Sequence, residues 1–249
     1  MHEDTERNEL ASEKRLSNKR IARALLCDEN NAAESWRIFK IISEFVSGFE
    51  VLQKYDLAAT FFGSARCGFG DKVYKQTTEL SGKLSKAGFA IITGGGGGVM
   101  EAANKGAFEA GGPSVGLNIE LPSEQVLNKY LNDTQGFHYF FTRKVMLAFA
   151  SEVYIFLPGG FGTLDELFEI ATLIQTKKIP YLPLVLIGKE YWEPLITWLR
   201  NDLYMHARAI DKRDLDLFHI CDSVDEAFDV IIEQTKNARK RVDAREVPA

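Results

Sequence analysis

The ten residues Leu157–Glu166 read LPGGFGTLDE and form a glycine-rich turn. An apolar run from Val153 to Leu157 leads into this turn, and apolar residues at helical spacing follow it from Leu164 to Thr176. A strand, a glycine turn and a helix start in this order suit an anion, because a helix N-terminus presents unpaired N–H groups and a partial positive charge. We therefore predict a phosphate site at this turn, with Glu166 beside it in the first turn of the helix.

Short apolar runs alternate with helical patterns from residue 57 to about residue 235. The runs expected to be strands are Leu57–Phe62, Phe89–Thr93, Ser114–Ile119, His138–Phe141, Ser151–Leu157, Pro183–Ile187 and Leu217–Cys221. This alternation predicts the α/β class, with a Rossmann-like three-layer domain whose mostly parallel sheet is flanked by helices. We divide the chain into an N-terminal helical extension (residues 1–55), the Rossmann-like domain (56–235) and a C-terminal tail (236–249).

Helix signals lie between these runs. The expected helices are an amphipathic one over Glu34–Tyr55, one over Lys72–Ala87, one ending at Ala110, one entered at Ser123, one starting at Arg143 after a Thr142 cap, and those over Leu164–Thr176, Tyr191–Leu203 and Val224–Thr235. Residues 1–20 are charged and polar and are expected to be an exposed helical tail.

Five consecutive glycines, Gly94–Gly98, follow the second expected strand. Each glycine costs backbone entropy when it is ordered, and a linker would not stand between a buried strand and an amphipathic helix. We therefore expect a ligand to approach the backbone there. The loop Gly63–Arg66 adds the Ser64 hydroxyl and a guanidinium. Sites in parallel sheets lie at the carboxyl ends of strands, where these loops and the Pro158–Thr163 turn fall.

Several common nucleotide and hydrolase motifs are absent from the sequence. Neither the glycine run nor the first strand carries G-x-G-x-x-G, and there is no G-x-x-x-x-G-K-[ST] and no G-x-S-x-G. The four histidines form no ligand-like pair, and the three cysteines lie far apart, so no metal site is indicated. A mononucleotide therefore fits the glycine turns better than a dinucleotide.

The overall composition limits the partners. The chain has 249 residues, 45% of them hydrophobic, and a net charge of −5, which argues against general nucleic-acid binding. The charged N-terminus is not followed by an apolar signal segment, and no apolar run reaches the roughly 18 residues of a membrane-spanning helix. We expect a cytoplasmic protein that does not bind membranes.

Three motifs resemble those of the LOG family, phosphoribohydrolases that act on nucleoside 5′-monophosphates, including cytokinin ribotides. Pro158–Glu166 matches the family signature PGGxGTxxE, Thr93–Asn104 is similar to the family's glycine-rich motif, and Arg143-Lys144 resembles its arginine–lysine pair. The resemblance covers about residues 57–200, and the N-terminal extension looks like that of the longer branch. One departure is Gly97, where many relatives have proline.

The resemblance implies that Arg143 and Glu166 are catalytic. Cleavage of an N-glycosidic bond builds positive charge on the sugar, which a carboxylate stabilises while it orients or deprotonates water. The expected substrate-binding residues are Ser64, Gly95, Gly96, Met100, Lys144, Gly159, Gly160, Gly162 and Thr163. Purely structural roles remain as alternatives: Arg143 and Glu166 could form a structural ion pair, Thr163 could be an ordinary N-cap, and Met100 could contribute only to packing. Glu101 is a weaker second acid.

The expected function is hydrolysis of AMP or an N6-modified AMP to free base and ribose 5-phosphate, without a cofactor. Two alternatives remain: a non-catalytic nucleotide-binding protein on the same fold, and a different transfer reaction at the phosphate-bearing sugar. The resemblance also implies a homodimer or a higher homo-oligomer. The apolar faces of Trp36–Leu52 and Tyr191–Leu203 are candidates for burial between subunits.

Overall fold

The structure of the protein is a computed structural model that describes residues 34–120 and 127–243. The chain divides between Ser43 and Glu44, inside helix α2 (Glu34–Leu52), into two compact units. The sequence-based division was placed after residue 55. The expected polar tail at residues 1–20 and the helix start at Ser123 lie outside the described residues.

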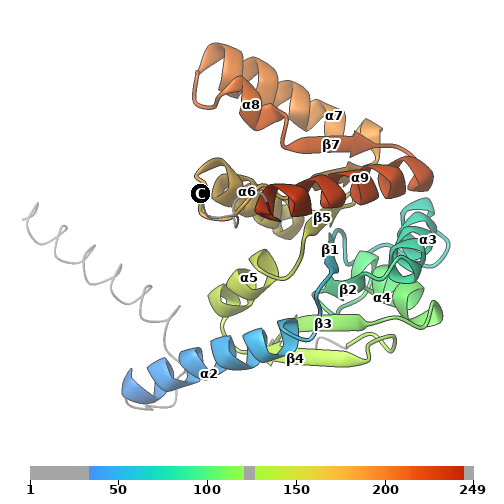
Figure 1. Cartoon of the computed structure of the whole chain (residues 1–249), viewed down its shortest axis with the longest axis vertical. Helices are drawn as coiled ribbons and strands as arrows, with labels where there is room; N and C mark the ends of the chain where they lie inside the picture. Colours follow the sequence, from blue (N-terminus) through green and yellow to red (C-terminus); the bar gives the residue numbers. More distant parts are fainter. Residues whose placement is uncertain (1–33, 121–126, 244–249) are drawn as a thin grey trace, which may run out of the picture. The chain divides into compact units, whose positions relative to one another are not determined.

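A seven-stranded sheet forms the centre of the second unit, and every neighbouring pair of strands is parallel. Its order is β4-β3-β2-β1-β5-β6-β7 (Figure 1). The strands are β1 (Ala58–Phe62), β2 (Ala90–Thr93), β3 (Ser114–Ile119), β4 (Asp133–Phe137), β5 (Val153–Phe156), β6 (Leu184–Ile187) and β7 (Phe218–Cys221). The predicted α/β class with a parallel sheet is confirmed.

Helices cover both faces of this sheet, which is why the central strands are continuously apolar. They are α3 (Lys72–Lys86), α4 (Val99–Glu109), α5 (Phe140–Ala148), α6 (Phe161–Gln175), α7 (Lys189–Trp198), the π-helix η1 (Leu199–His206), α8 (Lys212–Leu215) and α9 (Val224–Asp243). Alternate residues of β1 divide between two cores. Ala58 and Phe62 pack with α5, α6, α7 and the end of α2, whereas Ala59 and Phe61 pack with α3, α4 and α9.

The strand order reverses direction between β1 and β5, which lie side by side. From β1 the chain proceeds outward through β2 and β3 to β4, and from β5 it proceeds the opposite way through β6 to β7. Loops at the carboxyl ends of two such strands turn to opposite faces and leave a crevice between them, the usual ligand site of open α/β sheets. The loops after β1 and β5 are Gly63–Arg66 and Pro158–Gly160.

The prediction of a strand at His138–Phe141 was wrong. The strand in this region is β4, which begins five residues earlier, and its residues Asp133–Phe137 pair with Val115–Ile119 of β3. β4 is the edge strand and most of its side chains are partly exposed, so its sequence DTQGF lacks an apolar pattern. The aromatic run instead begins α5 at Phe140, and the expected cap Thr142 lies inside that helix.

Two further helix boundaries differ from the predicted ones. The helix expected to end at Leu203 is α7, which passes into the π-helix η1 at Leu199. The last helix, α9, extends to Asp243, eight residues past the expected end. The residues after Thr235 look like a tail by composition, but the helix continues through them to Asp243.

Candidate functional site

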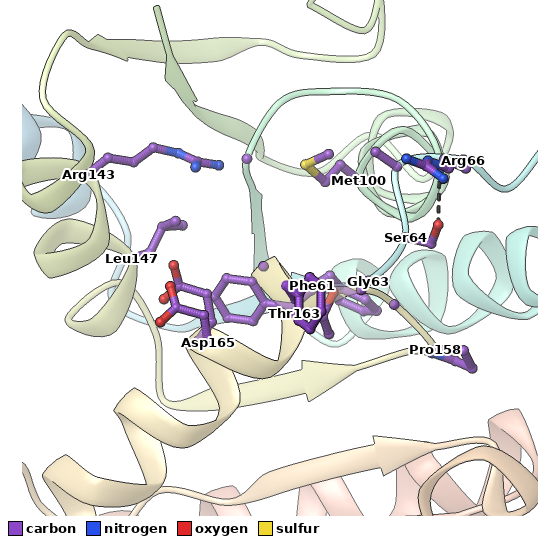
Figure 2. Close-up of a pocket in the computed structure, with 18 of the residues that line it drawn as sticks. Phe61, Gly63, Ser64, Arg66, Met100, Arg143, Leu147, Pro158, Thr163 and Asp165 are labelled. Carbon is purple, nitrogen blue, oxygen red and sulfur yellow. Dashed lines mark hydrogen bonds between the residues drawn. The ribbon is translucent and has the colours of Figure 1, made fainter. Parts of the chain in front are cut away.

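A cavity of about 800 Å³ opens at the switch point between β1 and β5. In Figure 2, Arg143 reaches in from α5 on one side, Thr163 and Asp165 stand on α6, and Ser64 and Arg66 come from the loop after β1. The predicted site residues that line it are Ser64, Met100, Arg143, Gly159, Gly160, Gly162, Thr163 and Glu166. Residues from two loops and three helices therefore converge on one cavity.

The N-terminus of α6 forms one end of the cavity. Its N-cap, Gly160, has an extended backbone and provides no side-chain cap. In the described part of the chain, the N–H groups from Gly159 to Gly162 have no hydrogen-bond acceptor, whereas Thr163 N donates to Gly160 O at 3.0 Å. Ser64 N donates to Pro158 O at 3.0 Å and joins this turn to the loop after β1. The free N–H groups and the helix dipole make this end suited to an anion.

The glycines of this turn are explained by different physical causes. A Cβ on Gly159 would overlap the Thr163 side chain, so packing alone requires glycine there. A Cβ on Gly160 or Gly162 would meet nothing within 4 Å, and neither residue has a positive φ. The fold does not require glycine at these two positions. Close approach of a ligand to the backbone does explain both of them.

Glu166 is the sixth residue of α6 and therefore lies in its second turn, not in the first turn as expected. It is 6% exposed, and its Oε2 atom is buried with no hydrogen-bond partner in the described chain. Burial raises the pKa of Glu166 to about 7; the neighbouring Lys144 and Arg143 oppose the rise, while Glu169 and Asp165 add to it. A buried carboxyl with a free oxygen and this pKa is suited to proton transfer near neutral pH.

Lys144 does not line the cavity, although it was expected to bind substrate. Its Nζ contacts three carboxylates of α6: Asp165 in a short ion pair, Glu169 Oε2 at 2.9 Å and Glu166 Oε1 at 3.7 Å. Desolvation lowers the pKa of Lys144, but the hydrogen bonds to Asp165 and Glu169 outweigh it and raise the pKa overall. Lys144 thus places a positive charge next to Glu166, outside the cavity lining, and this charge lowers the pKa of Glu166.

A hydrogen bond from its side chain to a backbone carbonyl holds Arg143 at the opposite wall. Its Nε donates to Leu117 O at 2.7 Å, which leaves the Nη groups to face the cavity. Burial lowers the pKa of Arg143 from its ordinary value, and the Glu166 carboxylate opposes this shift. No ion pair joins Arg143 to Glu166 within the described residues, so the alternative of a structural Arg–Glu pair is not supported.

The glycine run serves the site mainly through packing. Gly94 lines the cavity, and a Cβ there would overlap the Arg143 guanidinium and the Met100 sulfur. Gly98 has φ +67 and lies directly against the backbone of the loop after β1. Gly95 and Gly96 lie outside the cavity lining, and both of their carbonyl oxygens accept hydrogen bonds from Asn128 Nδ2. Direct substrate contact by Gly95 and Gly96 is not part of this geometry.

Sequence reasoning missed five other residues of the lining: Phe61, Phe62, Phe140, Leu147 and Asp165. Helical spacing carried a signal for two of them, because Phe140 and Leu147 lie three and four residues from Arg143 and share its face of α5. Arg66 is exposed and its N–H donates to Ser64 Oγ at 3.1 Å. It adds a second cation to the cavity.

Two kinds of site are not found in residues 34–120 and 127–243. No group of three or more histidine, cysteine, aspartate or glutamate side chains there is arranged to hold a metal ion. No helix within these ranges is both long and apolar enough to cross a membrane.

The fold and the cavity define a Rossmann-like α/β protein with a helix N-terminus suited to an anion and a buried carboxyl beside it. The chain belongs to the LOG family, whose model is described as "Possible lysine decarboxylase" and matches residues 100–231, more than half of the chain. This match includes Arg143 and Glu166.

Curated relatives share the central part of the chain. A probable cytokinin riboside 5′-monophosphate phosphoribohydrolase of Oryza sativa subsp. japonica is 31% identical over 125 residues, 49% of this chain and 50% of the rice protein. The chain thus spans half the length of that relative. Cytokinin riboside 5′-monophosphate phosphoribohydrolases of Rhodococcoides fascians and Arabidopsis thaliana are each 29% identical, over 58% and 60% of this chain and 74% and 71% of their own lengths.

Solved structures with the same fold include the molybdenum cofactor carrier protein of Chlamydomonas reinhardtii, with a TM-score of 0.54 and 22% identity over 73% of this chain and 98% of that chain. The molybdenum cofactor binding protein of Rippkaea orientalis has a TM-score of 0.50 and 20% identity over 71% of this chain and 94% of its own. At this identity the likeness supports the fold alone.

Proposed function

We propose that the protein hydrolyses the N-glycosidic bond of a nucleoside 5′-monophosphate, AMP or an N6-modified AMP, and releases free base and ribose 5-phosphate. One observation carries the proposal: Glu166 has a buried, unpartnered Oε2 in the wall of a cavity whose end is a helix N-terminus with free N–H groups. The names of the curated relatives support the same reaction.

The phosphate occupies the N-terminus of α6 in this proposal. The N–H groups from Gly159 to Gly162 and the Thr163 side chain bind it, and Arg66 and Ser64 close the other side. Glu166 lies four positions after Gly162, which corresponds to about 6 Å along a helix axis. A phosphate at the N-terminus thus brings the attached sugar to the Glu166 carboxyl.

The reaction replaces the C1′–N bond with a C1′–O bond. As the base departs with the bonding electron pair, positive charge on C1′ and the ring oxygen is stabilised by ionised Glu166. Glu166 accepts a proton from the attacking water, whose oxygen bonds to C1′, and that proton ends on the departing base. The Arg143 Nη groups donate to the base and stabilise its developing negative charge. Phe140 and Met100 provide an apolar wall for the base.

The lysine decarboxylase suggested by the family description is not supported by the chemistry of the cavity. An amino-acid decarboxylase that uses pyridoxal phosphate needs a lysine to hold the cofactor. None of the described residues that line the cavity is a lysine, and Lys144 is engaged by three carboxylates of α6.

The test is a panel of AMP, N6-alkylated AMP, other nucleoside monophosphates and adenosine, with products separated by chromatography. We expect free base and ribose 5-phosphate in equal amounts from at least one monophosphate. We expect much slower cleavage of adenosine, because it lacks the phosphate that the α6 turn binds. The absence of free base from every monophosphate would contradict the proposal.

A non-catalytic nucleotide-binding protein is the second candidate. The observation that favours it is the likeness in fold to proteins named as molybdenum cofactor carrier and binding proteins. The glycine turn alone would satisfy such a role, whereas the unpartnered oxygen of Glu166 is not needed for binding. Calorimetry that detects AMP binding, combined with no release of base over days, would favour this candidate. In either case we propose that the protein acts in the cytoplasm.

A further inference from the structure

Helix α2 carries a buried carboxylate that the proposed reaction does not use. Glu44 is 8% exposed, and all its recorded partners lie around the start of α5. Its Oε1 accepts the N–H of His138 at 2.8 Å. Its Oε2 accepts the N–H of Tyr139 at 3.3 Å and lies 2.5 Å from the Thr142 hydroxyl.

The start of α5 needs such a partner from outside. Its N-cap residue, Tyr139, makes no side-chain cap, and the first turn of the helix contains no acidic residue. The unpaired N–H groups and the positive end of a helix are stabilised by a negative side chain. Glu44 supplies this charge from a helix that is about a hundred residues away in sequence. Such long-range capping is invisible to local sequence patterns.

The part of α2 that carries Glu44 is fixed against the same elements. A Cβ on Gly48 would overlap the Met146 side chain of α5 and approach Phe137 at the end of β4. Val51, one turn further, is buried in the core that contains Met146. The close approach at Gly48 and the core contact at Val51 hold Glu44 at the start of α5.

The contacts of Glu44 continue directly to the catalytic arginine. Thr142, whose hydroxyl contacts both Glu44 and Tyr139 O, is the residue before Arg143. Arg143 is then held by its 2.7 Å hydrogen bond to Leu117 O. We propose that Glu44 is a positioning residue: it fixes the start and rotation of α5 so that the Arg143 guanidinium faces the cavity. This inference rests on the proposed function, because it assigns Glu44 a part in the same reaction.

The primary test replaces Glu44 with glutamine, which keeps the size but removes the charge and turns one acceptor into a donor that faces backbone N–H groups. We expect Glu44→Gln to lower kcat by about tenfold to a hundredfold, because small misplacement of a catalytic group has effects of this size, while KM for the monophosphate rises by a smaller factor of about threefold. The control is Glu50→Gln on the exposed side of the same helix, and we expect this variant to have the kcat and KM of wild type.

A double variant separates positioning of Arg143 from a general loss of structure. If Glu44 acts through Arg143, then adding Glu44→Gln to Arg143→Ala lowers kcat no further. Thr142→Val should show part of the loss in kcat, whereas Thr142→Ser should keep kcat near wild type because serine retains the hydroxyl. These two variants test the same contact if Glu44→Gln does not fold. Unchanged kcat in folded Glu44→Gln, or losses that multiply in full, would overturn the inference.

A binding measurement keeps this inference distinct from the proposed function. If wild-type protein binds AMP but releases no base, the proposed function fails. Calorimetry then tests Glu44 alone: we expect Glu44→Gln and Arg143→Ala to weaken AMP binding to a similar extent, and the double variant to weaken it no further. AMP affinity that is equal in Glu44→Gln and wild type would overturn the role of Glu44.

Discussion

Glu166 is a carboxyl that is held away from water by α5 and α6, and its protonation depends on its few neighbours. Burial favours the neutral form, and so do Glu169 and Asp165 on α6, whereas Lys144 and Arg143 on α5 favour the ionised form. The result is a pKa of about 7. A proposed base that is half ionised at neutral pH can accept a proton in one step and return it in the next.

Replacement of Lys144 should change the pH dependence of the reaction. Since Lys144 lowers the pKa of Glu166, Lys144→Met should raise it and move the acidic limb of the kcat/KM profile upward by about one pH unit, equivalent to about 1.4 kcal/mol. Lys144→Arg, which retains the charge, should leave the limb within a few tenths of a unit. A profile that Lys144→Met does not move would argue against Glu166 as the titrating group.

The raised pKa of Glu166 should also make the free energy of unfolding depend on pH when no substrate is bound. Burial raises the pKa of Glu166 to about 7 from 4.5, so its contribution to stability is full below about pH 4.5 and is lost as the pH rises through about 7. Glu166→Gln avoids this loss. We expect the variant to exceed wild type by about 1 to 3 kcal/mol in the free energy of unfolding at pH 8 and by much less at pH 5. Equal differences at the two pH values in urea titrations would contradict the burial argument.

For some residues of the candidate site that the sequence pointed to, a local motif also sets the geometry. The turn at Gly159–Thr163 and Glu166 belong to one helix start, so their relation follows from helix geometry. Lys144 is next to Arg143 in sequence, yet α5 turns about 100° per residue and directs the two side chains to different neighbours, so adjacency was a poor guide. The contact of Glu44 with the start of α5 depends on tertiary packing alone.

The loop after β2 lies against the Arg143 side chain of α5 and limits where that side chain can lie. Gly94 leaves the space that the Arg143 guanidinium occupies, whereas a Cβ on Gly97 would make only an ordinary contact with Ala65 O at 3.6 Å. Both glycines lie in one run and neither has a positive φ, so they form a matched pair.

Alanine at these two positions should therefore have different effects. We expect Gly94→Ala to displace Arg143 and reduce kcat/KM by on the order of a hundredfold, and Gly97→Ala to stay within about threefold of wild type. Steady-state kinetics of the two variants, with thermal melts as a folding control, provide the measurement. Equal activity of the two variants would mean that the space at Gly94 does not matter.

The strands of the core were predicted from sequence because both faces of the sheet are buried. β1, β2, β3, β5 and β6 each form an almost continuous apolar run, which marks a buried parallel strand. β4 is an edge strand with the polar sequence DTQGF, and backbone pairing with β3 makes it a strand without an apolar signal. The aromatic residues after it gave a false strand signal, because Phe140 and Phe141 belong to the first turn of α5.

At the scale of the molecule, the reversal of strand order brings distant segments to one cavity. Neighbouring strands β1 and β5 are about ninety residues apart, and their loops supply Ser64 and the Gly159–Thr163 turn. This topology follows from the alternation of strands and helices, so the position of the site was predictable even where individual lining residues were not.

We propose that the functional unit is a homodimer or a larger homo-oligomer. Large apolar side chains are exposed in both segments that the sequence pointed to: Phe49 at 43% on α2, and Trp198 at 49% on α7. Light scattering should give at least twice the monomer mass of 28.0 kDa. Phe49→Glu or Trp198→Glu should lower the mass, and Phe69→Glu, exposed on another surface, should not. A wild-type mass near 28 kDa would contradict the proposal.

We propose that Glu166 performs chemistry rather than binding, and a comparison of Glu166→Gln with wild type distinguishes the two roles. AMP, or the monophosphate that the substrate panel selects, is bound to each protein in calorimetry, and release of free base is then followed under single-turnover conditions. We predict binding within about tenfold of wild type and a loss of turnover of at least about a thousandfold, because the proposed phosphate site is unchanged while the carboxylate is gone. A variant that binds and still releases base at the wild-type rate would show that Glu166 does not carry out the reaction.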